Sequence, residues 1–234
     1  MKKDLIYDNQ QTLFGAREIV GFGSDDWHIK EIDRKLANDL IVKNHYSKKF
    51  YNATYIHLGV FIDRELLGVL QYGYAMNPAS CGSVVEGTEQ DQYLELNRMW
   101  LDDKAERNSE SKAISYSLRY IRSKYPRIKW IQSFADERCG CFGIVYQACS
   151  FSFYGEHSSE FWESEDGEVF HNSMITDSRM KGQPAYEKAM KAKKEGKLKK
   201  HKLRQFRYLF FIDKRWKKKC LLKEKPYLKY YNGD

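Results

Sequence analysis

Three features of membrane and secreted proteins are missing from this chain of 234 residues. No apolar run approaches the roughly 20 residues that a membrane-spanning helix needs. The start, Met1-Lys2-Lys3-Asp4, is charged but is not followed by the apolar segment of a secretory signal. The five cysteines form no C-x-x-C pair. We therefore expect reduced thiols, no membrane partner and a cytoplasmic location.

The cysteine spacing leaves one metal alternative open. Cys139, Cys141, Cys149 and His157 would supply the four ligands that a structural zinc site uses. A C-x-C pair is poor spacing for such a site, because paired zinc cysteines are usually separated by roughly two to four residues. We therefore favour free thiols over zinc.

The net charge of +8 is unevenly distributed. Residues 188–225 contain 17 lysines and arginines against three acids, a net of +14, and residues 1–187 carry −6 because Lys229 and Asp234 cancel. A solvated tail or a membrane-binding surface can carry such charge. The basic segment also contains many aromatic residues, which a solvated tail does not need: Phe206, Tyr208, Phe210, Phe211, Trp216, Tyr227, Tyr230 and Tyr231. An ordered basic surface is typical of a polyanion binder, so we favour nucleic acid as the partner.

Hydrophobic periodicity predicts one mixed domain of helices and strands, with the basic segment as its C-terminal part. Helices are expected from Asp33 toward His45, from about Ser111 to Lys124, over residues 142–148 and over residues 185–200. Strands are expected at residues 18–22, 55–61, 66–74, 93–101, 128–135, 151–155, 169–174 and 207–212, with a hairpin turn at Asp63-Arg64 and a polar loop at 156–167.

The order of elements in residues 93–146 is typical of acyl-CoA-dependent N-acyltransferases. A strand at 93–101 is followed by a polar loop, an amphipathic helix, a buried strand and a short helix. Such a strand can pair with the pantetheine arm, and backbone N–H groups at the helix start favour the pyrophosphate. The candidate cofactor residues are Trp100, Arg107, Asn108, Ser109 and Ser111. The alternative is that the three polar residues at 108–111 only cap the helix.

Two residues are candidates for proton transfer. Tyr146 falls on the short helix, where its phenol can protonate a departing thiolate, although a single tyrosine on a helix is also a common core residue. Glu95 on the central strand occupies the position from which such enzymes often deprotonate an amine, and its alternative role is an ion pair with Arg98. His57, inside an apolar segment, is interpreted as a core histidine rather than a ligand.

Seven short segments, in order along residues 40–175, resemble the Mom DNA-modification proteins of phage Mu and its relatives. No single segment is specific, but their common order is. They are His45-Tyr46-Ser47, YIHLGVF at 55–61, LLGVLQYG at 66–73, ELNRMW at 95–100, Ser109-Glu110-Ser111, SFAD at 133–136 and Tyr146-Gln147-Ala148.

The resemblance implies an α/β (α+β) domain of GNAT-like fold, with a central mixed twisted sheet flanked by helices and a basic C-terminal extension. It also implies acetyl-CoA as donor, the N6 amine of adenine in double-stranded DNA as acceptor, and a methylcarbamoyl-type adduct that shields phage DNA from restriction in the host cytoplasm. The family's functional positions fall on His45, Tyr46, Ser111, Asp136 and Tyr146. Iron is associated with the family, and His45, Tyr46 and Asp136 are chemically suitable ligands.

The sequence departs from ordinary GNAT enzymes at the pyrophosphate loop. The usual glycine-rich loop is absent, and residues 107–112 (RNSESK) stand in its place. Because glycine lets the backbone approach a phosphate closely, the donor must here be held by serine hydroxyls, helix N–H groups and basic side chains. The chemistry is also unusual, since the methylcarbamoyl-type adduct carries a nitrogen that an acetyl group lacks.

The amine of a paired adenine lies inside the duplex, so the enzyme must flip the base out or capture it single-stranded. Aromatic side chains on which a flipped base could stack are Tyr51, Tyr72, Tyr74, Phe161 and Trp162. The candidate DNA-binding residues are Arg98, Lys199, Lys200, Lys202, Arg204, Arg207, Arg215, Lys217 and Lys218.

Three functions are consistent with these patterns, and we favour the first. It is an enzyme that modifies adenine in DNA, with a GNAT-like catalytic domain in residues 1–180 and a basic, DNA-contacting segment in residues 181–234. The second is a conventional N-acetyltransferase that acts on RNA, protein or a small amine. The third is a nucleic-acid-binding protein that has kept an acyltransferase fold without its catalysis.

Overall fold

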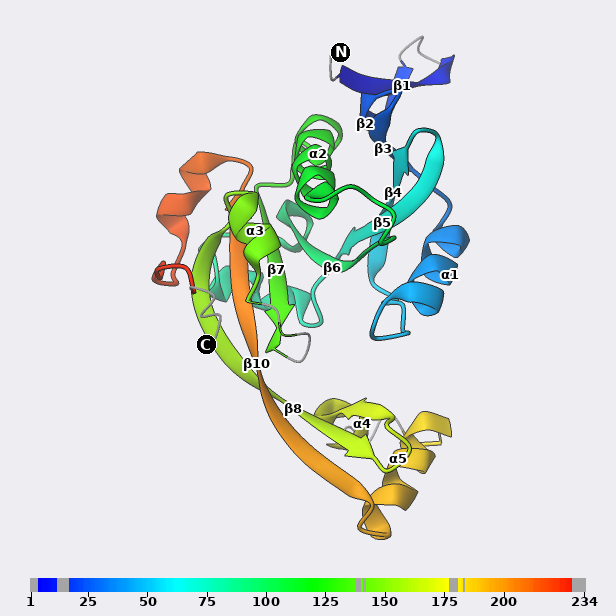
Figure 1. Ribbon diagram of the computed structural model, residues 1–234. Coiled ribbons are helices and arrows are strands. Elements are labelled where there is room, and N and C mark those ends of the chain that lie inside the picture. The colour runs from blue at the N-terminus through cyan, green and yellow to red at the C-terminus, as the bar shows by residue number, and fades with distance from the viewer. Residues whose placement is uncertain are drawn as a thin grey trace, which may run out of the picture.

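The computed structural model describes residues 4–11, 17–137, 140, 142–176, 181–182 and 184–228. Within these residues, ten strands form one sheet in the order β1-β2-β3-β4-β5-β6-β7-β10-β8-β9 (Figure 1). The strands are β1 (Asp4–Gln11), β2 (Arg17–Ser24), β3 (Trp27–Glu31), β4 (Thr54–Ile62), β5 (Glu65–Gly73), β6 (Tyr93–Leu101), β7 (Trp130–Asp136), β8 (Ser152–Ser164), β9 (Val169–His171) and β10 (Leu198–Phe211). The helices are α1 (Arg34–Asn44), α2 (Ser109–Lys124), α3 (Ile144–Ala148), α4 (Asn172–Thr176) and α5 (Pro184–Lys194), with 3-10 turns at Pro78–Ser83, Gln90–Gln92 and Lys214–Lys219. The expected mixed α+β fold is confirmed.

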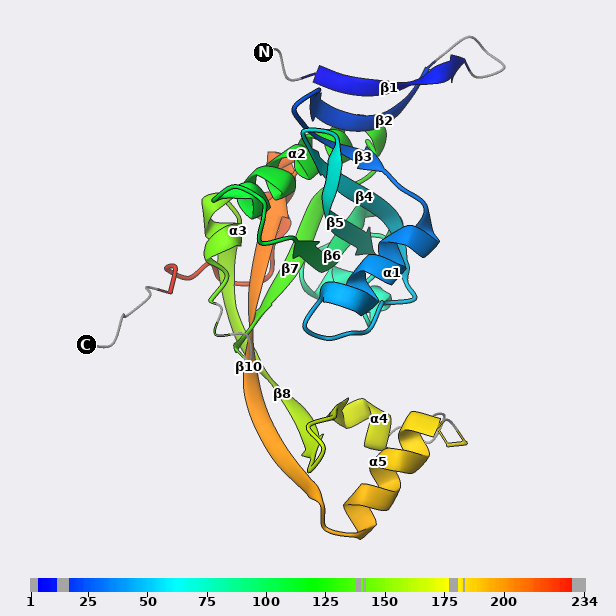
Figure 2. The same cartoon turned by 45° about the vertical axis from the view of Figure 1, so that its right-hand side comes forward.

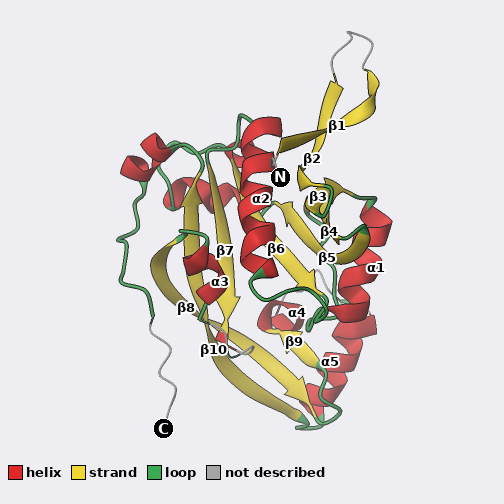
Figure 3. Cartoon of the chain, turned by 45° about the horizontal axis from the view of Figure 1, so that its top comes forward, coloured by secondary structure: helices red, strands yellow, loops and turns green. Residues whose placement is uncertain are grey.

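One strand pair differs from the rest of the described sheet. β6 and β7 run parallel, whereas the other described pairs are antiparallel. Their pairing covers three residues of each strand, Tyr93 to Glu95 and Trp130 to Gln132. Beyond these pairs the two strands diverge toward their C-terminal ends (Figure 3).

Helix α2 connects the two parallel strands, as a crossover must. Its apolar side chains, among them Ile114, Leu118 and Ile121, are buried in one core with Leu94 and Leu96 of β6. Side chains alternate across a strand, so the residues between these leucines face the opposite side of the sheet. On that side α1 packs Ala37 and Ile41 against Val69 and Trp100.

The local signals in the sequence largely hold. Asp33 is the N-cap of α1, and its Oδ1 accepts hydrogen bonds from the N–H groups of Lys35 (2.7 Å) and Leu36 (3.3 Å). Asp63 and Arg64 have φ angles of 47° and 71°, as a tight hairpin turn between β4 and β5 requires. The predicted strand at 18–22 is part of β2, and the structure adds β1 and β3 on either side of it.

The polar loop predicted at 156–167 is wrong. β8 continues to Ser164 and pairs with β10, from Glu156 with Phe206 to Ser164 with Leu198. The expected helix at 185–200 is shorter than predicted, because α5 ends at Lys194 and Gly196 adopts a φ of 70° before β10 begins. Main-chain pairing with a distant segment stabilises this half of β8, and a local hydrophobic pattern cannot reveal such pairing.

Paired β8 and β10 extend from the body as a ribbon that carries β9, α4 and α5 at its end (Figures 1 and 2). We call residues 156–205 the arm. The arm has a small core of its own around Phe170, Ile175 and Ala189. The Lys49 ammonium, from the loop after α1, lies 5.9 Å from the Phe170 ring and links the arm to the body.

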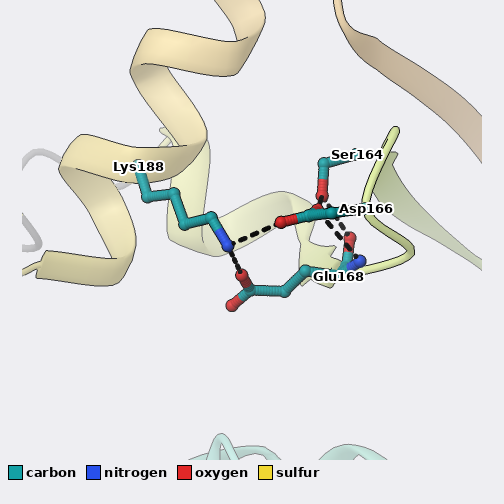
Figure 4. Close-up of polar contacts among 4 residues, drawn as sticks. All are labelled: Ser164, Asp166, Glu168 and Lys188. Atoms are coloured by element: carbon teal, nitrogen blue, oxygen red, sulfur yellow. Dashed lines mark hydrogen bonds and ion pairs between the residues drawn. The ribbon is translucent and has the colours of Figure 1, made fainter.

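Ion pairs attach α5 to the turn after β8 (Figure 4). The Lys188 ammonium lies 2.9 Å from Asp166 Oδ2 and 2.5 Å from Glu168 Oε2. Ser164 Oγ donates a hydrogen bond to Asp166 Oδ1, and these contacts lower the pKa of Asp166 to about 2. These contacts join α5 to the turn after β8 at the surface of the arm.

The basic segment after residue 180 supplies an internal strand of the main sheet. β10 lies between β7 and β8, and its second half pairs with β7 from Gln205 with Asp136 to Phe211 with Trp130. Phe206 and Tyr208 are buried in the main core. These two aromatic residues therefore serve the fold, as the interleaving of aromatic and basic residues indicated.

The N-cap of α1 offers a direct test of this fold. We expect Asp33→Ala to lower the free energy of unfolding by about 1 kcal/mol, because two N–H groups at the helix start lose their acceptor. Urea denaturation measures the change. Asp39→Ala, which removes an exposed pair with Lys35, is the matched control and should cost less than half as much. Equal losses in the two variants would contradict the N-cap assignment.

Candidate active site

A cavity of about 350 Å³ opens at the N-terminus of α2. Four of the five predicted cofactor residues line it, whereas Trp100 packs against α1 on the other face of the sheet. The lining residues are Glu106, Arg107, Asn108, Ser109, Ser111, Lys112, Ser115, Tyr116, Arg119 and Ala148. Polar and cationic groups therefore dominate a site at the positive end of a helix dipole, where anions bind favourably.

Asn108, the residue before the first turn of α2, adopts a backbone conformation that glycine takes most easily. Its φ of 69° and ψ of 11° lie in the left-handed region, which asparagine tolerates better than most non-glycine residues. Its side chain does not cap the helix. Ser111 Oγ instead donates to the Asn108 carbonyl at 2.9 Å. The chain thus forms the sharp turn into α2 without the glycines whose absence the sequence revealed.

One lysine and one arginine that line the cavity lie over aromatic rings. The Lys112 ammonium lies 4.4 Å from the Trp27 ring centroid, and the Arg119 guanidinium lies 5.5 Å from that of Phe22. Neither cation was predicted as a site residue. Their spacing in the sequence could have identified them, because residues 108, 112, 115 and 119 share one face of a helix and that face is polar.

A gap between β6 and β7 begins after Glu95 and Gln132, the last paired residues of the two strands. Ser133 Oγ donates to the Leu96 carbonyl at 3.3 Å, just beyond the last paired residues. The register between β5 and β6 slips at Asn97, whose side chain donates to the carbonyl of Tyr74 (3.1 Å) and to Glu95 Oε1 (3.1 Å). β6 after this bulge is paired with β5 but not with β7, so its β7 side faces the gap.

Glu95 lies on the face opposite α2, because it stands between Leu94 and Leu96 in the strand. Its Oε2 accepts a hydrogen bond from Gln132 Nε2 at 2.8 Å. Burial raises the pKa of Glu95, while the two amide hydrogen bonds and the charges of Arg98 and Arg207 act in the opposite direction. The carboxylate is thus held by two side-chain amides, and Arg98 acts on it electrostatically. A half-buried carboxyl with a raised pKa suits a general base.

Tyr146 lies on α3, which follows β7 in the chain. Its half-buried ring packs on Phe151 (5.7 Å between centroids) and on Tyr208 (5.4 Å). Cys149, just after α3, donates from Sγ to the Ser111 carbonyl at 3.1 Å and so joins α3 to the start of α2. Burial raises the pKa of the neighbouring Tyr72, and Tyr146 is among the groups that raise it further. Tyr146 therefore has a ring packed against the core, and its role as a proton donor stays a prediction.

Two of the three predicted iron ligands, His45 and Tyr46, lie together at the end of α1. His45 is 8% exposed at the end of α1, where its Nδ1 accepts a hydrogen bond from the Ser47 N–H (3.1 Å) and its ring lies 4.2 Å from that of Tyr46. Asp136 ends β7, opposite Gln205. The described residues contain no group of three or more His, Cys, Asp or Glu that could hold a metal. The prediction of an iron site therefore gains no support from this part of the chain.

The zinc alternative gains no support from the described residues either. Cys139 and Cys141 lie outside them. Cys149 is buried and hydrogen-bonded to the α2 backbone, and His157 packs edge-on against Phe134 at 5.3 Å.

The predicted DNA-binding residues fall into three groups. Lys199, Lys202 and Lys218 are exposed. Arg98 and Arg207 belong to the body of the sheet, where Arg98 Nε donates to the Lys49 carbonyl at 3.1 Å. The remaining four form ion pairs with acids: Lys200 with Glu160 (2.7 Å), Arg204 with Glu137 (2.6 Å), Arg215 with Asp213 (2.7 Å) and Lys217 with Glu224 (2.7 Å).

The aromatic candidates for base stacking lie in different environments in the structure. Tyr72 is fully buried in the main core and cannot stack on a base, so that prediction is wrong. Phe161 and Trp162 belong to the arm, and Phe161 is 8% exposed. Tyr51 lies close enough to Glu95 and Arg98 for both charges to affect its pKa, which burial raises. Tyr74 packs beside Tyr55 at 5.2 Å.

His57 is a core histidine, as its apolar surroundings in the sequence indicated. It is 8% exposed, and its Nδ1 lies 3.2 Å from Gln71 Nε2. Burial lowers its pKa.

A basic cavity at a crossover helix, a splayed parallel strand pair and a carboxylate on the opposite face make this a GNAT-like acyltransferase fold. Among solved structures, the chain is similar to Arabidopsis thaliana NAA60 in complex with acetyl-CoA, with a TM-score of 0.49 and 9% identity over 78% of this chain and 98% of that one. It is also similar to the ribosomal-protein-S5-alanine acetyltransferase of Vibrio fischeri, with a TM-score of 0.47 and 10% identity over 84% and 98% of the two chains.

The chain belongs to the Mom protein family, whose model matches residues 26–229. It is 48% identical over 231 residues to the methylcarbamoylase Mom of Escherichia phage Mu, and the match covers 97% of this chain and 94% of that protein. No described helix is long and apolar enough to cross a membrane.

The raised pKa of Glu95 predicts a specific pH dependence of stability. A carboxyl whose folded pKa exceeds its unfolded value near 4.5 favours the folded state below that value, and this contribution is lost as pH rises through the folded pKa. We therefore expect the stability of the unmutated protein, relative to Glu95→Gln, to fall as pH rises from about 4.5. Urea unfolding at several pH values measures it, with exposed Glu110→Gln as control. A relative stability that rises with pH would contradict the raised pKa of Glu95.

Proposed function

We propose that this chain uses acetyl-CoA to modify the N6 amine of adenine in DNA, with a methylcarbamoyl-type adduct as product. The observation that carries the proposal is the splayed β6–β7 pair, with a basic cavity on one side of the sheet and Glu95 on the other. Membership of the Mom family and the 48% identity to a methylcarbamoylase support the same reaction class.

The donor would bind along α2 and the gap. The first-turn N–H groups of α2, with Arg107, Lys112 and Arg119, suit the pyrophosphate. The β7-facing backbone of β6 after Asn97 offers donors and acceptors to the amides of the pantetheine arm. The thioester would then lie between β6 and β7, with Tyr146 beside it.

The acceptor would approach from the opposite face. Glu95 takes a proton from the base amine, and Tyr146 donates one to the departing thiolate. An adenine amine is a weak nucleophile because its lone pair is delocalised into the ring. A methylcarbamoyl group also carries a nitrogen that acetyl lacks, and its formation from acetyl is a two-electron oxidation. The full reaction therefore needs, in addition to acetyl-CoA, a nitrogen source together with a two-electron oxidant, or a single co-reactant whose nitrogen is at the oxidation level of hydroxylamine.

The DNA would be held by the arm and by the turn after β10. The exposed Lys199, Lys202 and Lys218 suit phosphate contacts, and the ion-paired basic residues can exchange their acids for phosphates. A flipped adenine can stack on Tyr51, which lies near Glu95, or on Tyr74, which packs beside Tyr55. For a phage, an adduct on adenine would protect its DNA from restriction in the host cell.

Mass spectrometry of nucleosides tests the proposal. DNA from cells that express the chain should contain a modified adenine, and Tyr146→Phe and Glu95→Gln should each reduce its amount at least about a hundredfold. Tyr7→Phe, on the exposed surface of β1, is the control and should keep the adduct.

The mass of the product separates the remaining functions. An N-acetyl product formed on RNA, protein or a small amine without DNA would replace the proposal by a conventional acetyltransferase. Unmodified DNA, together with salt-sensitive DNA binding and no affinity for CoA, would replace it by a binding protein.

A further inference from the structure

Arg207 differs from the other basic residues of β10. It is half-buried, and its guanidinium lies 5.0 Å from the ring of Phe134, its cross-strand neighbour on β7. Arg204, on the same strand, is exposed and pairs with Glu137 and Glu156. A half-buried guanidinium is costly unless it has partners, so the contacts of Arg207 need an explanation that those of Arg204 do not.

The partners of Arg207 lead to Glu95. Arg207 Nη1 donates to Gln132 Oε1 at 3.3 Å, and Gln132 Nε2 donates to Glu95 Oε2 at 2.8 Å. A side-chain amide has its acceptor on one branch and its donors on the other. With its oxygen on Arg207, Gln132 must present its NH₂ group to Glu95. The reverse orientation would set a donor against the guanidinium and an acceptor against the carboxylate.

We propose that Arg207 is a positioning residue, which orients Gln132 so that the Glu95 carboxylate is held in place and favoured in its charged form. This role rests on the proposed function, in which Glu95 accepts the proton of the base amine. This role differs from the DNA contact that the sequence predicted for Arg207 from its place in the basic segment.

The electrostatics of the surrounding groups agree with this role. Glu95 is faced by Arg98 and Tyr93 on its own strand, by Tyr51 from the loop after α1 and by Arg207 from β10. Burial raises the pKa of the carboxyl, and the two arginines oppose that rise. A general base must be ionised at the working pH. Arg207, fixed on the same face of the sheet as Glu95, favours the ionised carboxylate.

Arg207→Met and Arg204→Met test the role as a matched pair. Methionine keeps an apolar stem on Phe134 but removes the charge and the donors. In each background, the pH dependence of unfolding is compared with and without Glu95→Gln, which reports the titration of Glu95 without any measurement of activity. We expect Arg207→Met to raise the pH at which Glu95 titrates by about one pH unit. Arg204→Met should leave it unchanged.

Two further variants keep the test decisive if Arg207→Met does not fold. Gln132→Leu removes the link while Arg207 stays, and should also raise the pH of titration. Arg207→Lys keeps a cation that can donate to Gln132, and should restore a titration close to that of the unmutated protein. The pH at which adduct formation is half-maximal should move in parallel with these titrations.

DNA binding distinguishes the alternative. If Arg207→Met leaves the titration of Glu95 unchanged but weakens DNA binding and makes it less salt-dependent, Arg207 contacts phosphate and the proposal is overturned. If the titration shifts as expected but the unmutated protein forms no adduct on DNA, the positioning role stands and the proposed function fails.

Discussion

The short pairing between β6 and β7 is the constraint on which the rest of the site depends. Three paired residues on each strand hold the sheet together, and the strands then separate. The sheet survives the separation because β6 is paired on its other side with β5, and β7 with β10. The unpaired backbone groups therefore face an opening inside the sheet rather than an edge. Buried backbone groups need partners, so such an opening suits an extended ligand that carries amides of its own.

The opening also separates two environments. On one side, the start of α2 brings helix N–H groups and the cations Lys112 and Arg119 together in one cavity. On the other, Glu95, Gln132 and Arg207 form a hydrogen-bonded row across β6, β7 and β10. A negatively charged donor and a proton-bearing acceptor can thus reach one point from opposite faces without competing for the same groups. The basic segment contributes to the second environment through Arg207, and its exposed lysines lie on the arm.

Elements with strong local signals could be predicted from the sequence. The period-2 pattern of YLELNRMWL predicted β6 with the bounds that the structure shows, and the spacing of Ile114, Leu118 and Ile121 predicted α2 to within two residues at its start. The candidate cofactor residues at 107–111 were placed correctly at the start of a helix, where they line a cavity, because helix starts have a recognisable composition. Their role in cofactor binding stays a prediction.

The errors have a common physical origin, which is pairing between residues far apart in the chain. The outer half of β8 is polar and becomes a strand because β10 lies against it. Tyr72 was indistinguishable in sequence from Tyr51, yet α2 covers it completely. Arg207 lies in the basic segment, so its sequence neighbours suggested that it binds DNA. Its contact with Gln132 forms because β10 inserts beside β7. Local patterns determine elements, whereas the order of strands determines which side chains meet.

Hydrogen exchange in the presence and absence of acetyl-CoA tests the central claim most directly. If the donor occupies the gap, exchange should slow at residues 97–101 of β6, 133–136 of β7 and 109–111 of α2, and stay unchanged at the second cavity, which lies at the end of the arm. That cavity is lined by Glu163, Ser164, Glu165, Gly196, Lys197, Leu198 and Lys199. Protection confined to the arm, or no protection at saturating acetyl-CoA, would show that the splayed pair does not hold the donor.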